Sequence, residues 1–408
     1  MNSVVSRCLR RNGFLMSLLG ASLLLVACGS SPKDYADAAP LASITPRMAF
    51  KPLWARATGE VPDYAHTQLP ITGDGRGVYV ASRQGEVMAF DAQTGKRLWR
   101  SDLGEALTGG PGVGEQLLFV ATREAELVAL DKTTGIERWR QRISSEMLAT
   151  PVVAGELVVT QTIDGRLAAY RARDGKKRWD YGRSTPKLTL RGTSTPLIVG
   201  DSVLAGFADG HLLKLNLITG ELLWEATIAV PHGRTELERL VDIDGLFSVA
   251  DDVVYVSSYQ GRVAAVSIAD GNILWARDMS SYTGLTVNAQ HVFITDASSR
   301  VWALDARTGA TLWRQDGLAR RELTAPAVLG DVVVVADFAG FVHGLSREDG
   351  AFVARENLDK AWSELVYVWD DDVLEDVFRT VSVPPRVIDD TLFVRDNLGA
   401  LLALRLAE

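Results

Sequence analysis

The sequence predicts an all-β fold: an eight-bladed β-propeller with four-stranded antiparallel blades, the last blade closed by the N-terminal strand. The first observation is a phrase of the form Asp-x-x-Thr-Gly-x-x-x-Trp, which runs from Asp91 to Trp99 and then recurs. The second is its period, because successive phrase glycines lie 38 to 51 residues apart. The third is that each copy holds four short apolar runs, as expected for an array of small sheets. The glycine and tryptophan of each copy are Gly95/Trp99, Gly135/Trp139, Gly175/Trp179, Gly220/Trp224, Gly271/Trp275, Gly309/Trp313 and, with alanine replacing tryptophan, Gly350/Ala354.

Each copy predicts two hairpins. In the first copy, Val87 to Phe90 leads into a turn of Asp, Thr and Gly, and the chain then resumes an extended run to Trp99. Aspartate and threonine bond turn backbone, and glycine tolerates positive φ. Ten residues before most phrase glycines lies a second turn residue: Gly85, Ala125, Gly165, Gly210, Gly261, Ser299 and Gly340. With the Val-rich run before it, each copy makes four strands, and radial stacking covers the outer tryptophan.

The ends of the chain decide the number of blades. A further second-hairpin signal occurs at Gly399, but the chain ends before a tryptophan strand can follow. The run from Phe50 to Trp54 looks like an outer strand without a preceding hairpin, so we expect it to complete the last blade. The alternative is seven blades and an unrelated N-terminal strand.

Three segments are predicted. Residues 1–27 combine Arg7, Arg10 and Arg11 with an apolar run too short to span a bilayer, as in a secretory signal. The run Leu25-Val26-Ala27-Cys28-Gly29 matches the bacterial lipoprotein box, in which the cysteine is acylated. Residues 28–46 are then an acylated Cys28 and a flexible tether, and residues 47–406 the propeller. The alternative is an ordinary signal peptide cut nearby, which leaves a free thiol.

Composition excludes several function classes. The net charge of −8 becomes more negative once the arginines of the signal are removed, which disfavours nucleic acid and anionic lipid as partners. With Cys8 in the signal and Cys28 as the lipid site, no disulfide is expected. The five histidines show no ligand spacing, and no Gly-x-Ser-x-Gly, phosphate loop or Cys–His pairing occurs. No catalytic residue, cofactor or metal is therefore predicted.

The connections after Trp179, Trp224 and Ala354 are longer than the others, and all should decorate one face of the disc. The first contains Leu188, Leu190 and Arg191, and the next contains Asp242 and Asp244. Two leucines, an arginine and an acidic pair on neighbouring loops form a candidate protein-binding patch. The alternative is that both leucines pack down on the propeller while Arg191 pairs with one of the aspartates.

The third long connection, residues 356–385, contains Trp362, Trp369 and a run of carboxylates from Asp370 to Asp376. The run lacks the spacing of a calcium loop, so a solvated acidic face on a short helix is favoured over a calcium site. The tryptophans are a candidate contact for a partner or a substrate strand.

The lipoprotein box, the repeats, the Leu-x-Leu-Arg-Gly loop and the Arg-Leu-x-Asp-x-Asp loop together resemble the family of B lipoprotein subunits of the outer-membrane β-barrel assembly machinery. The resemblance implies a non-enzymatic scaffold, lipid-anchored in the outer membrane and facing the periplasm. It implies binding to periplasmic domains of the barrel-forming subunit, with unfolded outer-membrane proteins as a further candidate partner. Carried over by motif, the partner contacts are Leu188, Leu190, Arg191, Asp242 and Asp244. The alternatives are a quinone-dependent periplasmic dehydrogenase, since the same repeat builds such enzymes, and a periplasmic scaffold with another partner.

Overall fold

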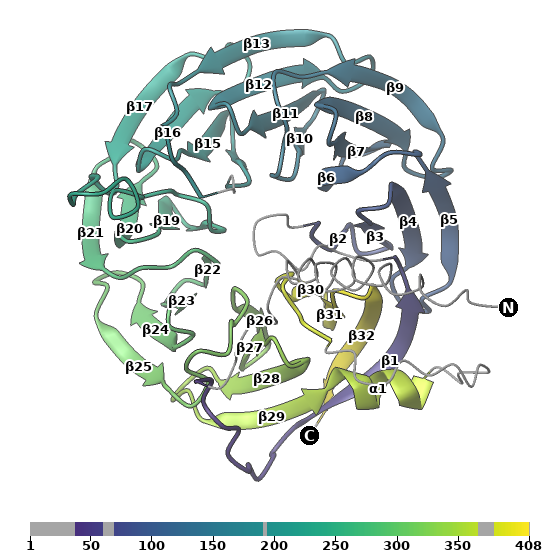
Figure 1. Ribbon diagram of the computed structural model, residues 1–408, viewed down its shortest axis with the longest axis vertical. Coiled ribbons are helices and arrows are strands. Elements are labelled where there is room, and N and C mark those ends of the chain that lie inside the picture. The colour runs from purple at the N-terminus through teal and green to yellow at the C-terminus, as the bar shows by residue number, and fades with distance from the viewer. Residues whose placement is uncertain (1–36, 60–68, 191–193, 366–378, 408) are drawn as a thin grey trace, which may run out of the picture. The chain divides into compact units, whose positions relative to one another are not determined.

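The computed structural model describes residues 37–59, 69–190, 194–365 and 379–407. The strands form eight four-stranded antiparallel sheets, which are arranged in a ring as the blades of a β-propeller (Figure 1). Seven blades use four consecutive strands, and the eighth combines the last three strands with the first. The predicted eight-bladed propeller, closed by the N-terminal strand, is confirmed. The seven-blade alternative is excluded.

Blades are numbered along the chain, and each is given from its inner to its outer strand. Blade 1 is β2 (Thr72–Gly73), β3 (Gly77–Ala81), β4 (Glu86–Asp91) and β5 (Arg97–Asp102). Blade 2 is β6 (Leu107–Val113), β7 (Leu117–Thr122), β8 (Glu126–Asp131) and β9 (Glu137–Arg142). Blade 3 is β10 (Val152–Ala154), β11 (Leu157–Thr162), β12 (Arg166–Arg171) and β13 (Lys177–Gly182). Blade 4 is β14 (Leu197–Val199), β15 (Ser202–Gly206), β16 (His211–Asn216) and β17 (Leu222–Thr227).

Blade 5 is β18 (Ser248–Ala250), β19 (Val253–Ser257), β20 (Arg262–Ser267) and β21 (Ile273–Asp278). Blade 6 is β22 (Leu285–Val287), β23 (His291–Thr295), β24 (Val301–Asp305) and β25 (Thr311–Gln315). Blade 7 is β26 (Ala327–Leu329), β27 (Val332–Ala336), β28 (Phe341–Ser346) and β29 (Phe352–Asn357), followed by the helix α1 (Leu358–Leu365). Blade 8 is β30 (Arg386–Ile388), β31 (Thr391–Arg395), β32 (Ala400–Ala407) and β1 (Ala49–Ala57).

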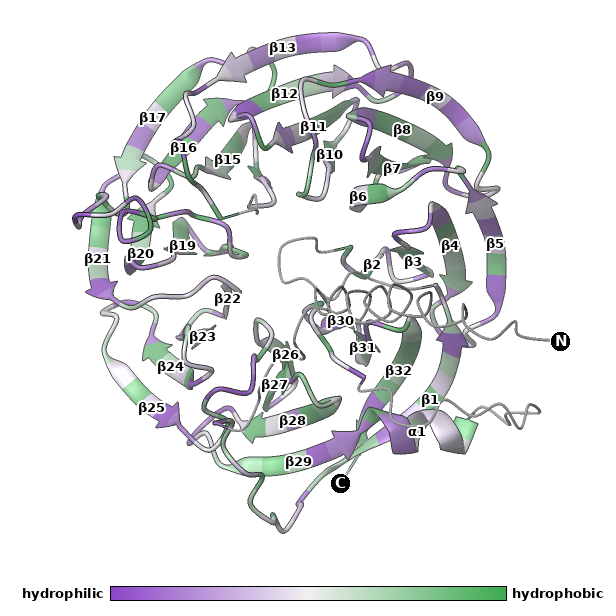
Figure 2. Ribbon diagram, in the orientation of Figure 1, coloured by the Kyte–Doolittle hydropathy of each residue, from purple (hydrophilic) through white to green (hydrophobic). Residues whose placement is uncertain are grey.

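Burial follows the position of a strand within its blade. The second and third strands are almost fully buried, as in β7 and β8, because neighbouring blades cover both faces of each sheet. The outer strands are largely exposed, and in β5 only Trp99 is buried. Figure 2 shows the same contrast, with β8 and β32 largely hydrophobic and β9 and β13 largely hydrophilic. The core therefore lies between the blades, and each blade needs its neighbours to bury its apolar residues.

The repeated turn has the predicted chemistry. In blade 1 the carboxylate of Asp91 accepts hydrogen bonds from the N–H of Thr94 at 2.8 Å and from its hydroxyl at 2.6 Å. These bonds lower the pKa of Asp91. Gly95 then adopts a φ of 64° and donates its N–H to the carbonyl of Asp91 at 2.9 Å. The other phrase glycines also have positive φ, which explains why the turn requires glycine.

A tryptophan of the outer strand joins seven of the eight blades to the next blade. The Trp99 ring lies against Gly135 of blade 2, where an added Cβ would come within 2.5 Å of the ring. The indole N–H of Trp99 donates to the carbonyl of Lys132 in the same turn at 2.9 Å. A side chain on Gly135 would displace the Trp99 ring. The glycine of each phrase therefore makes room for the tryptophan of the preceding blade. The same contact occurs in the pairs Trp54/Gly95, Trp139/Gly175, Trp179/Gly220, Trp224/Gly271, Trp275/Gly309 and Trp313/Gly350.

The second hairpin follows the prediction with one difference. Ala125 and Ser299 replace glycine and nevertheless adopt a φ of 60°. In blade 5, however, positive φ falls on Gln260, at 47°, and not on Gly261. Gly261 is required for space, because a Cβ there would lie 2.2 Å from the hydroxyl of Ser258. That hydroxyl accepts the N–H of Arg262 at 3.0 Å.

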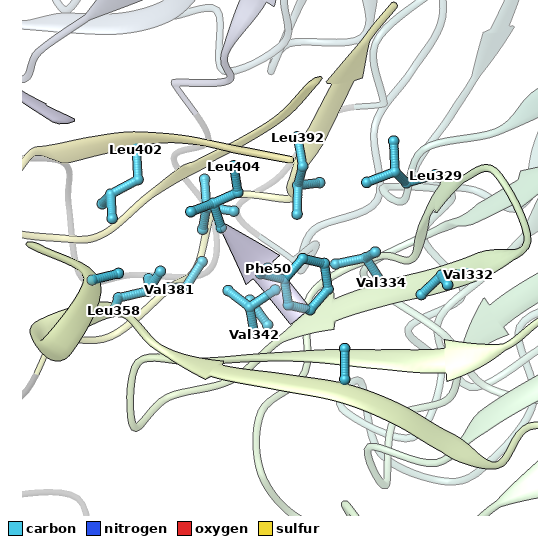
Figure 3. Packing of buried hydrophobic residues seen from close by; sticks show 14 of the residues in the cluster. Phe50, Leu329, Val332, Val334, Val342, Leu358, Val381, Leu392, Leu402 and Leu404 are labelled. Carbon is cyan, nitrogen blue, oxygen red and sulfur yellow. The ribbon is translucent and has the colours of Figure 1, made fainter. Parts of the chain in front are cut away.

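The contact between blades 7 and 8 is built differently. Blade 8 has no phrase turn, and correspondingly blade 7 has Ala354 in place of tryptophan. Phe50 of β1 fills this junction and is 2% exposed, together with aliphatic residues of both blades and α1 (Figure 3). β1 pairs with β32 from Ala49 opposite Ala407 to Ala57 opposite Ala400, with a bulge between Pro52 and Trp54.

A buried arginine seals the junction between blade 8 and blade 1. Arg395 is 0% exposed and donates to the carbonyls of Ala81 at 2.7 Å, Thr58 at 3.1 Å and Gly59 at 3.0 Å. Burial lowers the pKa of Arg395 to about 10. Hydrogen bonding to carbonyls of both neighbouring segments offsets the cost of burying the cation.

Candidate docking surface

One face of the propeller carries the long connections. Each connection leaves the outer strand beside the hairpin between the second and third strands. In blade 3 the N–H of Arg183 donates to the carbonyl of Gly165 at 3.0 Å, and in blade 4 the N–H of Ile228 donates to that of Gly210 at 2.9 Å. We call this side the link face. The segments 183–190, 194–196 and 228–247 therefore lie on the same face, over consecutive blades.

The structure brings three of the predicted contact residues together. The N–H of Leu190 donates a hydrogen bond to the carboxylate of Asp242, across the two loops. Asp244 and Leu190 both line a cavity of about 160 Å³ between blades 3 and 4. Leu188 is 44% exposed and Leu190 is half-buried, so the two leucines do not pack down as a pair. Arg191 lies outside the described residues.

Asp242 and Asp244 are held in a low-polarity environment. Asp242 is 1% exposed, and burial raises its pKa to about 7, while the N–H of Leu190 lowers that pKa and Asp209 raises it. The pKa of Asp244 is raised well above its usual value, by burial and by the charge of Asp242. Asp242 Oδ1 and Asp244 Oδ2 have no hydrogen-bond partner within the described ranges. At this exposure Asp242 offers almost no surface to a partner, and its role in the structure is to hold the backbone at Leu190.

Sequence reasoning missed part of the apolar surface of the link face. Leu237 is 63% exposed and Val230 is 68% exposed, and both belong to the connection after blade 4. Leu237 sits in a turn ordered by a capping box. The Thr235 hydroxyl accepts the N–H of Glu238 at 3.2 Å, and the Glu238 carboxylate accepts the N–H of Thr235 at 3.1 Å. The sequence did contain a signal for this residue. Thr235-x-x-Glu238 is a capping-box pattern, and the leucine inside it lies between two glutamates, which indicates an exposed position.

The third long connection begins with the helix α1, which ends at Leu365, before the acidic run. In α1, Leu358 and Ala361 are buried in the junction of blades 7 and 8. Trp362 is half-buried, and the guanidinium carbon of Arg379 lies 5.3 Å from the centroid of its ring. Trp369 and the carboxylates from Asp370 to Asp376 lie outside the described residues.

Comparisons with known proteins identify the family. A family model described as "Outer membrane protein assembly factor BamB" matches residues 83–315. A protein of that name from Pseudomonas aeruginosa is 47% identical over 387 residues, which are 95% of this chain and 97% of the relative. Another from Alkalilimnicola ehrlichii is 46% identical over 406 residues, 99% of each chain. This chain belongs to the BamB family.

Solved structures agree with the BamB fold. The crystal structure of BamB from Moraxella catarrhalis superposes with a TM-score of 0.76 at 27% identity, covering 87% of this chain and 99% of that one. A quinohemoprotein alcohol dehydrogenase from Comamonas testosteroni has a TM-score of 0.64 at 11% identity, with 87% and 76% covered. The second likeness concerns the fold alone.

In the part of the chain that the structure describes, no three His, Cys, Asp or Glu side chains gather as a metal site would require. Within the same ranges, no helix is both long and apolar enough to cross a membrane.

Proposed function

We propose that this chain is a non-enzymatic scaffold lipoprotein of outer-membrane protein assembly. In this proposal it binds periplasmic domains of the barrel-forming subunit of the assembly complex and assists folding and insertion of outer-membrane proteins. Family membership supports the general role, since the relatives are named outer membrane protein assembly factors. The contact surface is the link face over blades 3 and 4, with Leu188, Leu190 and Leu237 as apolar anchors.

One observation carries the choice of surface. The backbone N–H of Leu190 is bound by the buried carboxylate of Asp242, which fixes one loop on the other while Leu188 stays 44% exposed. An apolar side chain held out on a fixed loop loses little conformational entropy when a partner covers it. Asp242 and Asp244 then act by supporting this loop, and Arg191 supplies a charge that sets the register of the partner.

The test is affinity purification of the lipidated protein from detergent-solubilised outer membrane, followed by a binding measurement with the purified barrel-forming subunit. Leu188→Asp should weaken binding roughly 30-fold, because a central apolar anchor contributes on the order of 2 kcal/mol. Leu98→Asp is the matched control, since Leu98 is a leucine of similar exposure, 53%, on the outer strand of blade 1.

Both variants should retain the melting temperature of the wild-type protein, because neither leucine is buried. Equal recovery of the barrel-forming subunit with Leu188→Asp and with Leu98→Asp would rule out the link face as its binding surface. A drop in melting temperature for Leu188→Asp alone would show that this leucine packs on the propeller.

The proposal places an acyl anchor on Cys28 and the propeller on the periplasmic side of the outer membrane. The lipoprotein box supports this placement, as does the name of the relatives. Mass spectrometry of the N-terminal peptide should find diacylglycerol on Cys28, and Cys28→Ser should release the protein from the membrane fraction. An unmodified Cys28 in membrane-associated protein would contradict the anchor.

The proposed role is non-catalytic, in contrast to a quinone-dependent dehydrogenase. The relatives named as assembly factors support it, whereas the dehydrogenase likeness is limited to the fold. Adding pyrroloquinoline quinone and calcium to the purified protein should leave the cofactor spectrum unchanged. A red-shifted, stoichiometric cofactor band would favour the enzyme.

A further inference from the structure

The segment before β1 is held against the propeller. The N–H of Ala39 donates to the carbonyl of Ala319 at 2.9 Å, in the connection between blades 6 and 7. The N–H groups of Arg47 and Met48 share the carbonyl of Val353 in β29, at 2.9 and 3.0 Å. In Figure 1 this purple segment begins beside β28 and β29 before the chain turns into β1. We call residues 38–48 the strap.

Two arginines of the propeller bind the carbonyls of the strap. Arg321 donates through Nη1 to the carbonyl of Ala39 at 3.1 Å, and Arg355 donates through Nη1 to that of Ala42 at 2.6 Å. Between these two contacts, the side chain of Leu41 packs on the apolar cluster of blades 6 and 7. The strap thus combines backbone hydrogen bonds with one apolar anchor.

The two arginines belong to one buried network. The carboxylate of Asp337 accepts from Nε of Arg321 at 2.6 Å and from Nε2 of His343 at 3.0 Å. Nδ1 of His343 in turn accepts from Nε of Arg355 at 3.1 Å. Asp337 and His343 are both 0% exposed, and burial lowers the pKa of His343. A neutral imidazole with its proton on Nε2 satisfies all of these contacts at once.

This network is unlike the contents of most blades. At the position of His343, blades 1, 2 and 4 have the apolar Met88, Val128 and Leu213, whereas blade 6 has Trp302, whose indole N–H donates to the carboxylate of Asp296 at 2.9 Å. Burying an aspartate and a histidine costs free energy unless they are paired and hydrogen-bonded. Here the buried pair fixes the guanidinium groups of Arg321 and Arg355. Each of these groups then donates through Nη1 to one carbonyl of the strap.

We propose that the strap fixes the point at which the N-terminal anchor leaves the propeller, so that blades 6 and 7 are held on the membrane side. The orientation rests on the proposed lipid anchor at Cys28. Cys28 and Ala38 are ten residues apart in the sequence, a reach of at most about 35 Å for an extended chain. Without the strap, the first fixed residue would be Ala49 in blade 8, and the reach would roughly double.

The orientation has a consequence for the docking surface. Blade 7 lies across the ring of eight blades from blade 3 (Figure 1). The loop that carries Leu188, which follows blade 3, therefore lies on the side of the ring opposite the strap, whereas the loop that carries Leu237, which follows blade 4, lies one blade closer to it. A partner domain that extends away from the membrane would find them accessible.

Hydrogen exchange tests the strap in the mature protein without lipid. The amides of Ala39, Arg47 and Met48 should exchange slowly in the wild type. The double variant Leu41→Ser/Arg355→Gln should speed their exchange roughly tenfold, because it removes the apolar anchor and one hydrogen bond. Arg347→Gln is the matched control in blade 7, since its side chain pairs with Asp331 and does not contact the strap. Unprotected amides in the wild type would overturn the proposal.

Energy transfer tests the orientation in the lipidated protein on vesicles with acceptor dye in the headgroups. The donor dye is attached to a cysteine introduced at Leu312 in blade 6 or at Ile136 in blade 2, whose wild-type side chains are 49% and 61% exposed. Because Cys28 is acylated, the introduced cysteine is the one that takes the dye. Transfer should be greater from Leu312→Cys, and the strap variant should reduce the difference. Equal transfer from both sites with an intact strap would overturn the proposed orientation. Protein that stays off the vesicles would refute the lipid anchor, and the orientation with it, while protected strap amides would still be seen in solution.

Discussion

The contact between Trp99 and Gly135 makes a quantitative prediction about how the blades are joined. Trp99→Ala should lower the free energy of unfolding by about 3–5 kcal/mol, the usual range for removing a large buried aromatic. Trp99 is 8% exposed, and the loss includes its hydrogen bond to the carbonyl of Lys132. Gly135→Ala should also destabilise, since it places a Cβ at a φ of 73° and within 2.5 Å of the ring.

The double variant distinguishes this contact from two independent defects. With Trp99 already removed, Gly135→Ala loses its clash and keeps only the cost of positive φ, about 1–2 kcal/mol. The two changes together should therefore cost less than their sum, by on the order of 1–3 kcal/mol. The assay is urea denaturation monitored by circular dichroism, with reversibility checked for each variant. The same cycle at Trp99 and Gly104, a positive-φ glycine whose added Cβ would meet nothing within 4 Å, is the control.

Additive costs for Trp99 and Gly135 would refute the reasoning, because the tryptophan and glycine would then act separately. Coupling of equal size in the control cycle would refute it as well, since it would reflect a general loss of cooperativity and not this contact.

Two further predictions concern the blade 7 junction and the acids of the link face. Ala354→Trp, which restores the repeat, should destabilise by about 1–3 kcal/mol or more, because Ala354 is 0% exposed and Phe50 already fills the junction; a higher melting temperature would contradict this. Asp242→Asn should stabilise the protein above about pH 7 and lose this advantage near pH 4. The folded pKa of Asp242, about 7, exceeds the unfolded value of 3.8, so the stability that the protonated group contributes is lost as pH rises through that interval. The upper limit is on the order of 4 kcal/mol, measured as melting temperature against pH. Destabilisation by Asp242→Asn at both ends of the range would mean that an ionised carboxylate is needed there.

Much of the fold could be predicted because each repeat is specified by contacts between residues close in the sequence, and the repeat recurs along the chain. Asp91, Thr94 and Gly95 specify their turn through contacts within five residues, and such contacts can be read from spacing alone. The number of blades and their closure followed from the same pattern, since Phe50 to Trp54 is recognisable as a strand without its hairpin. The candidate loops were also found, because they are the places where the period lengthens.

Tertiary structure alone decided which residue of a loop faces inward. Asp242 and Leu188 both lie in polar loops, yet Asp242 is 1% exposed and Leu188 is 44% exposed. The difference arises because the loop that carries Leu188 and Leu190 folds over the carboxylate of Asp242. It also decided what replaces the phrase tryptophan at Ala354, and how Arg321, Asp337 and His343 meet beneath residues 38–48. These contacts join residues far apart in the chain, and sequence spacing does not predict which of such residues meet. The repeat therefore determined the blades, and the packing of one blade or loop on the next determined the surface that they present.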